Sequence, residues 1–149
     1  MSIIRYKVTP TITAGAYAAN DVIGGRLQFV GARKGTLQSV TITDKAAQAV
    51  AYILVLFESQ PTGIADNATF DIDDADLDKI IYQVPLGAGG RQAFTDNIYH
   101  YSYGLNVPLK AAGNSIWGFL IASASTPTYA STSDITVTLQ METESPWSA

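Results

Sequence analysis

The chain has 149 residues, of which 47% are hydrophobic and only 15% are charged, with a net charge of −4 and no cysteine. This length suits one domain with a core of its own, and high apolar content with low net charge excludes a disordered chain. The absence of cysteine excludes disulfides and thiolate metal sites. The excess of thirteen acidic over nine basic residues argues against nucleic acid as a general partner.

The first ten residues, MSIIRYKVTP, place Arg5 and Lys7 within the apolar stretch, which is not the pattern of a secretory signal peptide. The longest apolar run, 49–57, is far shorter than the roughly 20 residues that a membrane helix needs. We therefore expect a protein that is made in the cytoplasm and has no membrane partner.

Alternation of polar and apolar residues, typical of half-buried strands, is the dominant pattern along the chain. The expected strands are 2–9, 26–30, 36–43, 50–57, 80–85, 97–107, 114–123 and 133–142. In 36–43 the apolar residues Leu37, Val40 and Ile42 share a face only after one slip of phase. The nearly continuous β-formers of 50–57 predict a strand that is buried on both faces.

Turn-forming residues separate these segments, and they predict a fold class. Glycine, proline and asparagine cluster at 24–25, 33–35, 60–63, 87–90, 112–114 and 126–128. About eight short strands at even spacing predict an all-β domain, either a β-sandwich or a jelly roll. With no internal repeat and no linker, residues 1–149 form a single expected domain, ending in an exposed tail at 143–149.

One segment departs from the strand pattern. Its five aspartates are Asp71, Asp73, Asp74, Asp76 and Asp78. Acidic side chains favour a helix N-terminus through capping and the macrodipole, so one short helical turn is expected near 73–80. Calcium is the alternative, but an EF-hand loop needs glycine at about its sixth position and a bidentate acid at its twelfth. Counting from Asp71 or Asp74 meets neither requirement.

The sequence contains no recognisable catalytic apparatus and implies no cofactor. Its one histidine, His100, is flanked by Tyr99 and Tyr101, and no G-x-S-x-G elbow accompanies it. We expect His100 to be a strand residue on a contact surface. The run GAGGR at 87–91 lacks the spacing of a phosphate loop, so a flexible hairpin loop is expected there.

Tyrosines and charges point to a binding surface. Tyr99, Tyr101 and Tyr103 share one face of a strand, as core, as a subunit contact or as a platform that stacks sugars. The first 34 residues carry five basic side chains against a single acid, and the aspartates gather in the middle of the chain, which favours pairing between copies. The candidate interface residues are Arg5, Tyr6, Lys7, Tyr99, Tyr101, Tyr103 and Trp147, with an acidic contact patch at Asp71, Asp73, Asp74, Asp76 and Asp78.

Several runs resemble a family of small head proteins of tailed bacteriophages. They are DVIGGRL at 21–27, LQSVTITDK at 37–45, LVLFESQP at 54–61, DNATF at 66–70 and DDAD at 73–76, and 116–141 is also similar. The likeness covers roughly residues 17–141, and its motifs are structural rather than catalytic.

The resemblance implies a capsid decoration or cement protein. Such proteins have compact β folds, often form trimers, and sit on the outside of an expanded head, where they clamp major capsid subunits against DNA pressure. The implied partners are the major capsid protein and sister copies, and the implied location is the exterior of a virion assembled in the host cytoplasm. Within this scheme, residues 2–9 would be an arm that adds a strand to a neighbour, and the tail with Pro146 and Trp147 would be an anchor.

Two other functions stay open at this point. The chain could be a carbohydrate-binding or host-attachment module of a virion, or a head–tail connector that is present in few copies. An enzyme is not expected, because no residues for general acid–base chemistry are visibly assembled.

Overall fold

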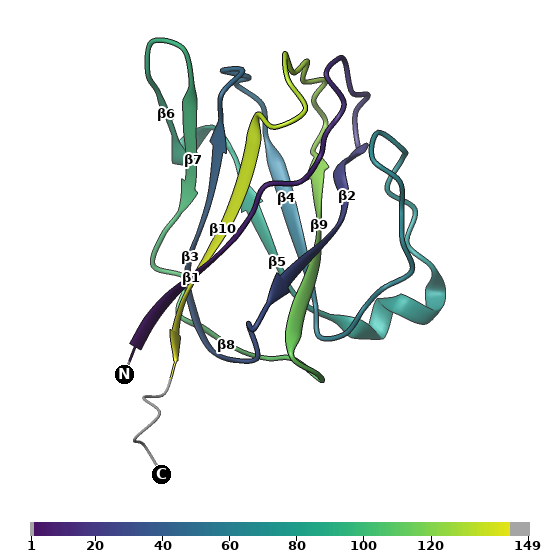
Figure 1. The fold of residues 1–149 in the computed structure, drawn as a ribbon, viewed down its shortest axis with the longest axis vertical. Coiled ribbons are helices and arrows are strands. Elements are labelled where there is room, and N and C mark those ends of the chain that lie inside the picture. The colour runs from purple at the N-terminus through teal and green to yellow at the C-terminus, as the bar shows by residue number, and fades with distance from the viewer. Residues whose placement is uncertain (1, 144–149) are drawn as a thin grey trace.

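Two antiparallel sheets face each other across a hydrophobic core in the computed structural model, which describes residues 2–143 (Figure 1). The strands are β1 (Ser2–Val8), β2 (Val22–Val30), β3 (Lys34–Asp44), β4 (Tyr52–Phe57), β5 (Ile80–Leu86), β6 (Arg91–Ala93), β7 (Ile98–Ser102), β8 (Val107–Lys110), β9 (Ser115–Ala122) and β10 (Ile135–Thr143). Two short 3₁₀ helices, η1 (Asp74–Lys79) and η2 (Ala88–Gly90), complete the elements. The predicted all-β fold and the helical turn near 73–80 are confirmed.

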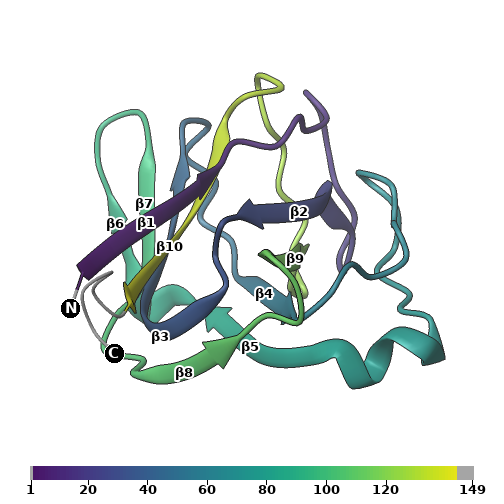
Figure 2. The ribbon, with the colours of Figure 1, turned by 60° about the horizontal axis from the view of Figure 1, so that its bottom comes forward.

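Four strand pairings lie one inside another along the chain. β1 pairs with β10, β2 with β9, β3 with β7, and β4 with β5. A long antiparallel hairpin gives this nesting when it rolls into two sheets, which is the arrangement of an eight-stranded jelly roll. The sheets have the orders β1-β10-β3-β7-β6 and β2-β9-β4-β5, and β8 also pairs with β3 (Figure 2). The eight strands of the roll correspond to the eight expected segments.

The two additional strands are corrections to the sequence prediction. The expected strand 97–107 is interrupted by left-handed backbone at Gly104 (φ 65°) and Asn106 (φ 54°), so β7 ends at Ser102 and β8 begins at Val107. The expected hairpin loop at 87–91 contains the helical turn η2 and leads into β6. Both added strands are three or four residues long, too short for an alternating pattern to reveal them.

A β-bulge accounts for the slip of phase in 36–43. Gln140 pairs with Ser39 and the next residue, Met141, pairs with Leu37, so Gln38 is the extra residue of β3. A bulge of this kind shifts the alternation by one position. Leu37 and Val40 therefore both reach the core, although they are three positions apart in sequence and would face opposite sides of a regular strand.

The two central strands of the four-stranded sheet, β4 and β9, are buried on both faces. The inner face of this sheet joins the main core between the sheets, which includes Leu54 and Leu120. Its outer face carries a second apolar cluster with Phe57 and Phe119 at its centre, and Phe70 from the long connection between β4 and β5 packs against it. This arrangement bears out the expectation of a doubly buried strand at 50–57. The connection carries η1 out to one side of the sandwich (Figure 2).

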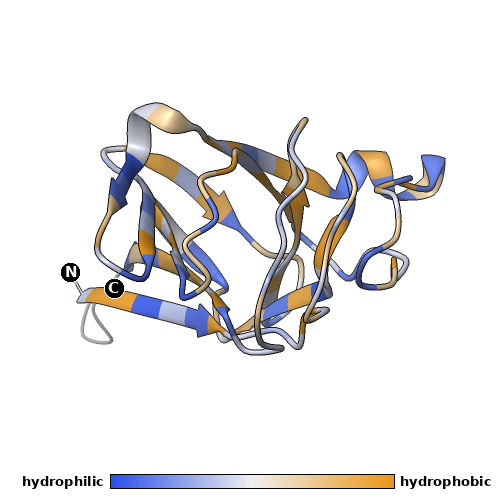
Figure 3. Cartoon of the chain, turned by 90° about the horizontal axis from the view of Figure 1, so that it is seen from above, coloured by the Kyte–Doolittle hydropathy of each residue, from blue (hydrophilic) through white to orange (hydrophobic). Residues whose placement is uncertain are grey.

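The expected N-terminal arm is part of the domain's own sheet. Residues 2–8 pair in register with β10, from Ser2 opposite Thr143 to Val8 opposite Val137. Polar and apolar residues alternate along this and other strands (Figure 3). The expected tail beyond residue 143, with Trp147, lies outside the described residues. Within residues 2–143, no helix is long and apolar enough to cross a membrane.

Candidate functional site

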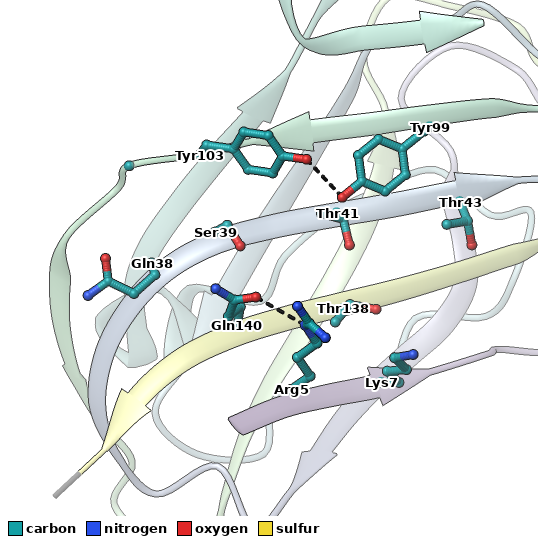
Figure 4. A pocket seen from close by; sticks show the side chains of 11 residues that line it. Arg5, Lys7, Gln38, Ser39, Thr41, Thr43, Tyr99, Tyr103, Thr138 and Gln140 are labelled. Atoms are coloured by element: carbon teal, nitrogen blue, oxygen red, sulfur yellow. Dashed lines mark hydrogen bonds between the residues drawn. The ribbon is translucent and has the colours of Figure 1, made fainter. Parts of the chain in front are cut away.

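The outer face of the six-stranded sheet carries a polar groove of about 530 Å³ (Figure 4). Arg5 and Lys7 of β1 stand along one side, and Tyr99 of β7 and Tyr103, just beyond that strand, stand along the other. Short polar side chains of β3 and β10 form the floor between them. Because alternate residues of a strand face opposite sides of its sheet, the residues between these polar positions enter the core.

The strand register sets the order of side chains across the floor. Arg5 lies opposite Gln140, which lies opposite Ser39, so these three form one row across β1, β10 and β3. The next row begins with Lys7 opposite Thr138. Ser39 and Thr138 are only 7% and 8% exposed. The floor is therefore recessed below the longer side chains on either side.

Arg5 is held over the groove by its neighbour. Its Nε donates a hydrogen bond to Gln140 Oε1 at 3.0 Å (Figure 4). Within residues 2–143, neither Arg5 nor Lys7 forms an ion pair. None of the described residues that line the groove is a carboxylate, although Gln38 at one end donates a hydrogen bond to Glu142 Oε2 at 2.9 Å. The groove thus concentrates two positive charges on a chain whose net charge is −4.

The three tyrosines form a stacked cluster beside the groove. Rings of Tyr101 and Tyr103 lie 4.6 Å apart at 23°, and rings of Tyr99 and Tyr101 lie 5.9 Å apart at 28°. The Tyr103 hydroxyl donates a hydrogen bond to the Tyr99 hydroxyl oxygen at 2.9 Å, and this bond raises the pKa of Tyr103 (Figure 4). Tyr99 and Tyr103 line the groove, whereas Tyr101 does not.

Two predicted contact residues face the interior instead. Tyr6 is half-buried against the main core, and burial raises the pKa of its hydroxyl. The expectation that His100 lies on a contact surface is wrong, because it is fully buried. His100 alternates with Tyr99 and Tyr101 along β7, so it points to the opposite side of the sheet from them.

His100 is buried without a polar partner among the described residues. Neither of its ring nitrogens has a hydrogen-bond partner within residues 2–143, and the same is true of Arg91 Nε. Burial, followed by the nearby Arg91 charge, lowers the pKa of His100 to about 4. A neutral imidazole enclosed in the core has no access to solvent.

The acidic run is exposed at four of its five aspartates. Asp71, Asp73, Asp74 and Asp78 are exposed, but the expected contact role of Asp76 is wrong because its side chain is 2% exposed. Asp76 accepts hydrogen bonds from the Thr62 backbone N–H at 2.8 Å and from Lys79 Nζ at 2.7 Å. The Lys79 and Thr62 hydrogen bonds lower its pKa to about 2. Asp76 thus ties η1 to the connection that precedes it.

Helix capping by an aspartate side chain is also absent from η1. Asp73 occupies the N-cap position, but its side chain makes no capping hydrogen bond, and its backbone carbonyl accepts from the Asp76 N–H at 2.9 Å. Among residues 2–143, no group of three or more His, Asp or Glu residues is placed to hold a metal ion.

Sequence reasoning missed the floor of the groove and one half-buried polar junction. The floor residues are Ser39, Thr41, Thr43 and Thr138, which are the outward-facing, uncharged positions of 36–43 and 133–142. This uncharged polar face was the feature of the sequence from which the floor could have been predicted.

The polar junction centres on Asp66, which accepts hydrogen bonds from Thr13 Oγ1, the Tyr17 hydroxyl and the Gly24 N–H at 2.6 to 2.7 Å. Burial and the Asp66 carboxylate raise the pKa of Tyr17 to about 12.

Comparison with known proteins identifies no relative of this chain. No protein-family model, no curated protein and no solved structure matches the chain.

Proposed function

We propose that this protein is a structural virion protein that binds the outer surface of a phage capsid and stabilises contacts between major capsid subunits. The observation that carries the proposal is the free side of β1. Within residues 2–143, β10 is the only strand that pairs with β1, so the backbone donors and acceptors on the other side of this seven-residue strand are unpaired. Such a free strand edge is a template for the addition of a strand from another chain.

Apolar side chains accompany this free backbone. Ile3 is 65% exposed and Ile4 is 39% exposed, and they point to opposite faces of the sheet. A partner strand would cover both side chains at once, while Arg5 and Lys7 favour an acidic partner segment. Backbone pairing with apolar contacts on both sides is typical of a subunit interface.

The fold and composition are compatible with the proposal. Jelly rolls occur in viral capsid proteins and in lectins, although a shared fold is an analogy and does not by itself assign a function. The charged fraction of 15% is below the roughly 25% usual for soluble domains, which lowers the cost of burying surface against another subunit. Many copies on one shell would add avidity to a modest single contact.

The test is reconstitution on empty expanded capsids of the phage that encodes this chain, prepared without it. We expect the wild-type protein to sediment with the capsids at many copies per particle. An Ile3→Asp, Ile4→Asp double variant should lose most of this binding, because a charged side chain on each face opposes strand addition. Leu77→Asp is the matched control: Leu77 is 49% exposed on η1, away from β1, and its replacement should leave occupancy unchanged.

The outcomes separate the function from its mechanism. No sedimentation of the wild-type protein would contradict capsid binding itself. Full occupancy by the double variant would contradict the role of β1 while leaving capsid binding intact. Circular dichroism of both variants should match wild type, since each substituted side chain is exposed.

A further inference from the structure

We propose that the groove on the outer face of the six-stranded sheet binds an acidic oligosaccharide, a glycan segment that carries carboxylate or sulfate groups. This inference goes beyond capsid binding, because it concerns the outer face of the sheet rather than the free side of β1, although Arg5 and Lys7 take part in both proposals. It rests on the shape, the aromatic wall and the charge of the groove.

The shape suits an elongated polar ligand. The volume of about 530 Å³ lies within the roughly 300–1,000 Å³ typical of small-molecule sites. Such sites are mostly apolar, whereas this floor consists of serine and threonine hydroxyls. A ligand that exchanges hydrogen bonds with many hydroxyls fits this lining, and a glycan presents hydroxyls along its whole length. The ligand would run along β3 and β10, between the two raised sides.

The aromatic side supplies a stacking surface. Tyr103 is 56% exposed, unusually open for an aromatic side chain, and it is fixed by its hydrogen bond to Tyr99 and its stacking on Tyr101. Tyrosine combines an apolar ring with a polar hydroxyl, which suits the apolar C–H face and the hydroxyl rim of a pyranose. Because the Tyr99 oxygen accepts from Tyr103, the Tyr99 hydroxyl proton is left to donate to a ligand. The wall is therefore ordered before a ligand arrives.

The opposite side supplies the charge. The Arg5 Nε is engaged by Gln140, which orients the guanidinium and leaves its two terminal nitrogens for an anion. Planar guanidinium groups bind carboxylate and sulfate oxygens with two parallel hydrogen bonds. Lys7 adds a second positive charge two residues along the same strand. None of the described residues that line the groove carries a carboxylate, and the Glu142 carboxylate at one end is hydrogen-bonded to Gln38, so an acidic sugar meets two positive charges in the lining itself.

Two other anionic ligands fit less well. Single-stranded nucleic acid needs positive charge along the path of its backbone, but both cations of the groove lie on β1 and the chain as a whole is acidic. An acidic peptide needs an unpaired strand edge or apolar pockets as anchors, and the free side of β1 offers such an edge beside the groove but not on its floor. The floor strands β3 and β10 are each paired on both sides, and their outward side chains here are polar.

The experiment is calorimetric titration of the full-length protein with hyaluronan hexasaccharide and heparin hexasaccharide, which separate carboxylate from sulfate recognition. Neutral maltohexaose and a short oligothymidylate are the comparison ligands. We expect binding of at least one acidic sugar and no comparable binding of maltohexaose or oligothymidylate. Tyr103→Ala and Arg5→Gln should each raise the Kd for the acidic sugar by about tenfold or more.

Matched controls are available on the same chain. Phe94→Ala removes an equally exposed aromatic ring, 61% accessible, near the β6–β7 hairpin, and Lys110→Gln removes a charge that lies outside the groove. Both should bind the acidic sugar as wild type does. The inference would be overturned if neither acidic sugar bound, if oligothymidylate bound more tightly, or if Tyr103→Ala and Arg5→Gln bound like the controls.

Discussion

His100 and Tyr52 meet edge to face at the centre of the sandwich, with ring centroids 4.9 Å apart and planes at 87°. His100 belongs to β7 in one sheet and Tyr52 to β4 in the other, so this contact joins the two layers. Edge-to-face geometry places the positive rim of one ring on the negative face of the other. The contact requires a neutral imidazole, because a charged one would be enclosed without a hydrogen-bond partner.

Acid should therefore weaken the fold through His100. Its pKa of about 4 in the folded protein is below its ordinary value of 6.5, so the unfolded chain binds the proton more readily. The contribution to stability is complete above pH 6.5 and is lost as pH falls toward 4. We expect the free energy of unfolding to drop by on the order of 2 kcal/mol across this window, measured by urea denaturation at each pH.

His100→Phe provides the control for this pH dependence, because it keeps an aromatic ring against Tyr52 and removes the titration. Asp44 acts in the opposite direction. Burial raises its pKa in the folded protein, so its protonation at low pH stabilises the folded state relative to the unfolded chain. The comparison is therefore the difference between wild type and His100→Phe at each pH. A difference that does not change from pH 7 to pH 4.5 would contradict the assignment.

Asp66 should be a main structural support of the loops around it. Its carboxylate accepts three hydrogen bonds, from Thr13, Tyr17 and Gly24. Asp66→Ala leaves these donors unpaired, and we expect a loss of about 2 kcal/mol in the free energy of unfolding. Asp71→Ala, at an exposed position, should change stability by less than about 0.5 kcal/mol. If urea denaturation gave the same loss in the free energy of unfolding for Asp66→Ala and Asp71→Ala, the Asp66 junction would contribute no more to stability than an exposed residue.

Gly90 should tolerate no side chain. A Cβ at this position would lie 2.1 Å from the Tyr101 carbonyl oxygen, so η2 or β7 must shift. We expect Gly90→Ala to cost roughly 1–3 kcal/mol and to alter the near-ultraviolet circular dichroism of the tyrosine cluster. At Gly89 an added Cβ meets nothing within 4 Å, so Gly89→Ala is the matched control and should have little effect on either measurement.

The exposed aspartates provide a test of charge steering between copies. We expect the free protein to be a homo-oligomer, with a trimer favoured, measured by light scattering. Reversal of Asp73, Asp74 and Asp78 to lysine should weaken this assembly at low ionic strength, and the difference from wild type should shrink at high salt. Asp76 is left unchanged because it is buried and paired with Lys79. Unchanged assembly at both ionic strengths would exclude a contribution from these charges.

Local pattern was sufficient to predict the eight strands of the roll, because each has one polar and one apolar face or is buried throughout. The slip of phase in 36–43 was visible in the sequence, but only the register of β3 with β10 identifies it as a bulge at Gln38. The position of His100 could have been predicted by the same rule, since residues adjacent in a strand face opposite sides. The error came from treating the run around His100 as one contact surface.

The groove could not be predicted in the same way, because its residues become neighbours only through tertiary structure. Arg5 and Gln140 are 135 positions apart in the chain and hydrogen-bonded in the fold. Similarly, the sequence pattern does not distinguish the buried Asp76 from the exposed Asp74. Only the tertiary structure places the Thr62 backbone and the Lys79 side chain within hydrogen-bond distance of Asp76. The choice between Tyr101 and Tyr103 as the groove residue depends on side-chain directions that a sequence pattern does not contain.

The nested pairing of the strands also affects how the protein is made. β10 lies between β1 and β3, so β1 has no partner in the sheet until residues 135–143 have left the ribosome. Contacts between positions so distant in sequence slow folding, because a long loop must close before they form. The nascent chain therefore exposes apolar strands until β10 has emerged, which makes this interval the period of greatest risk of aggregation.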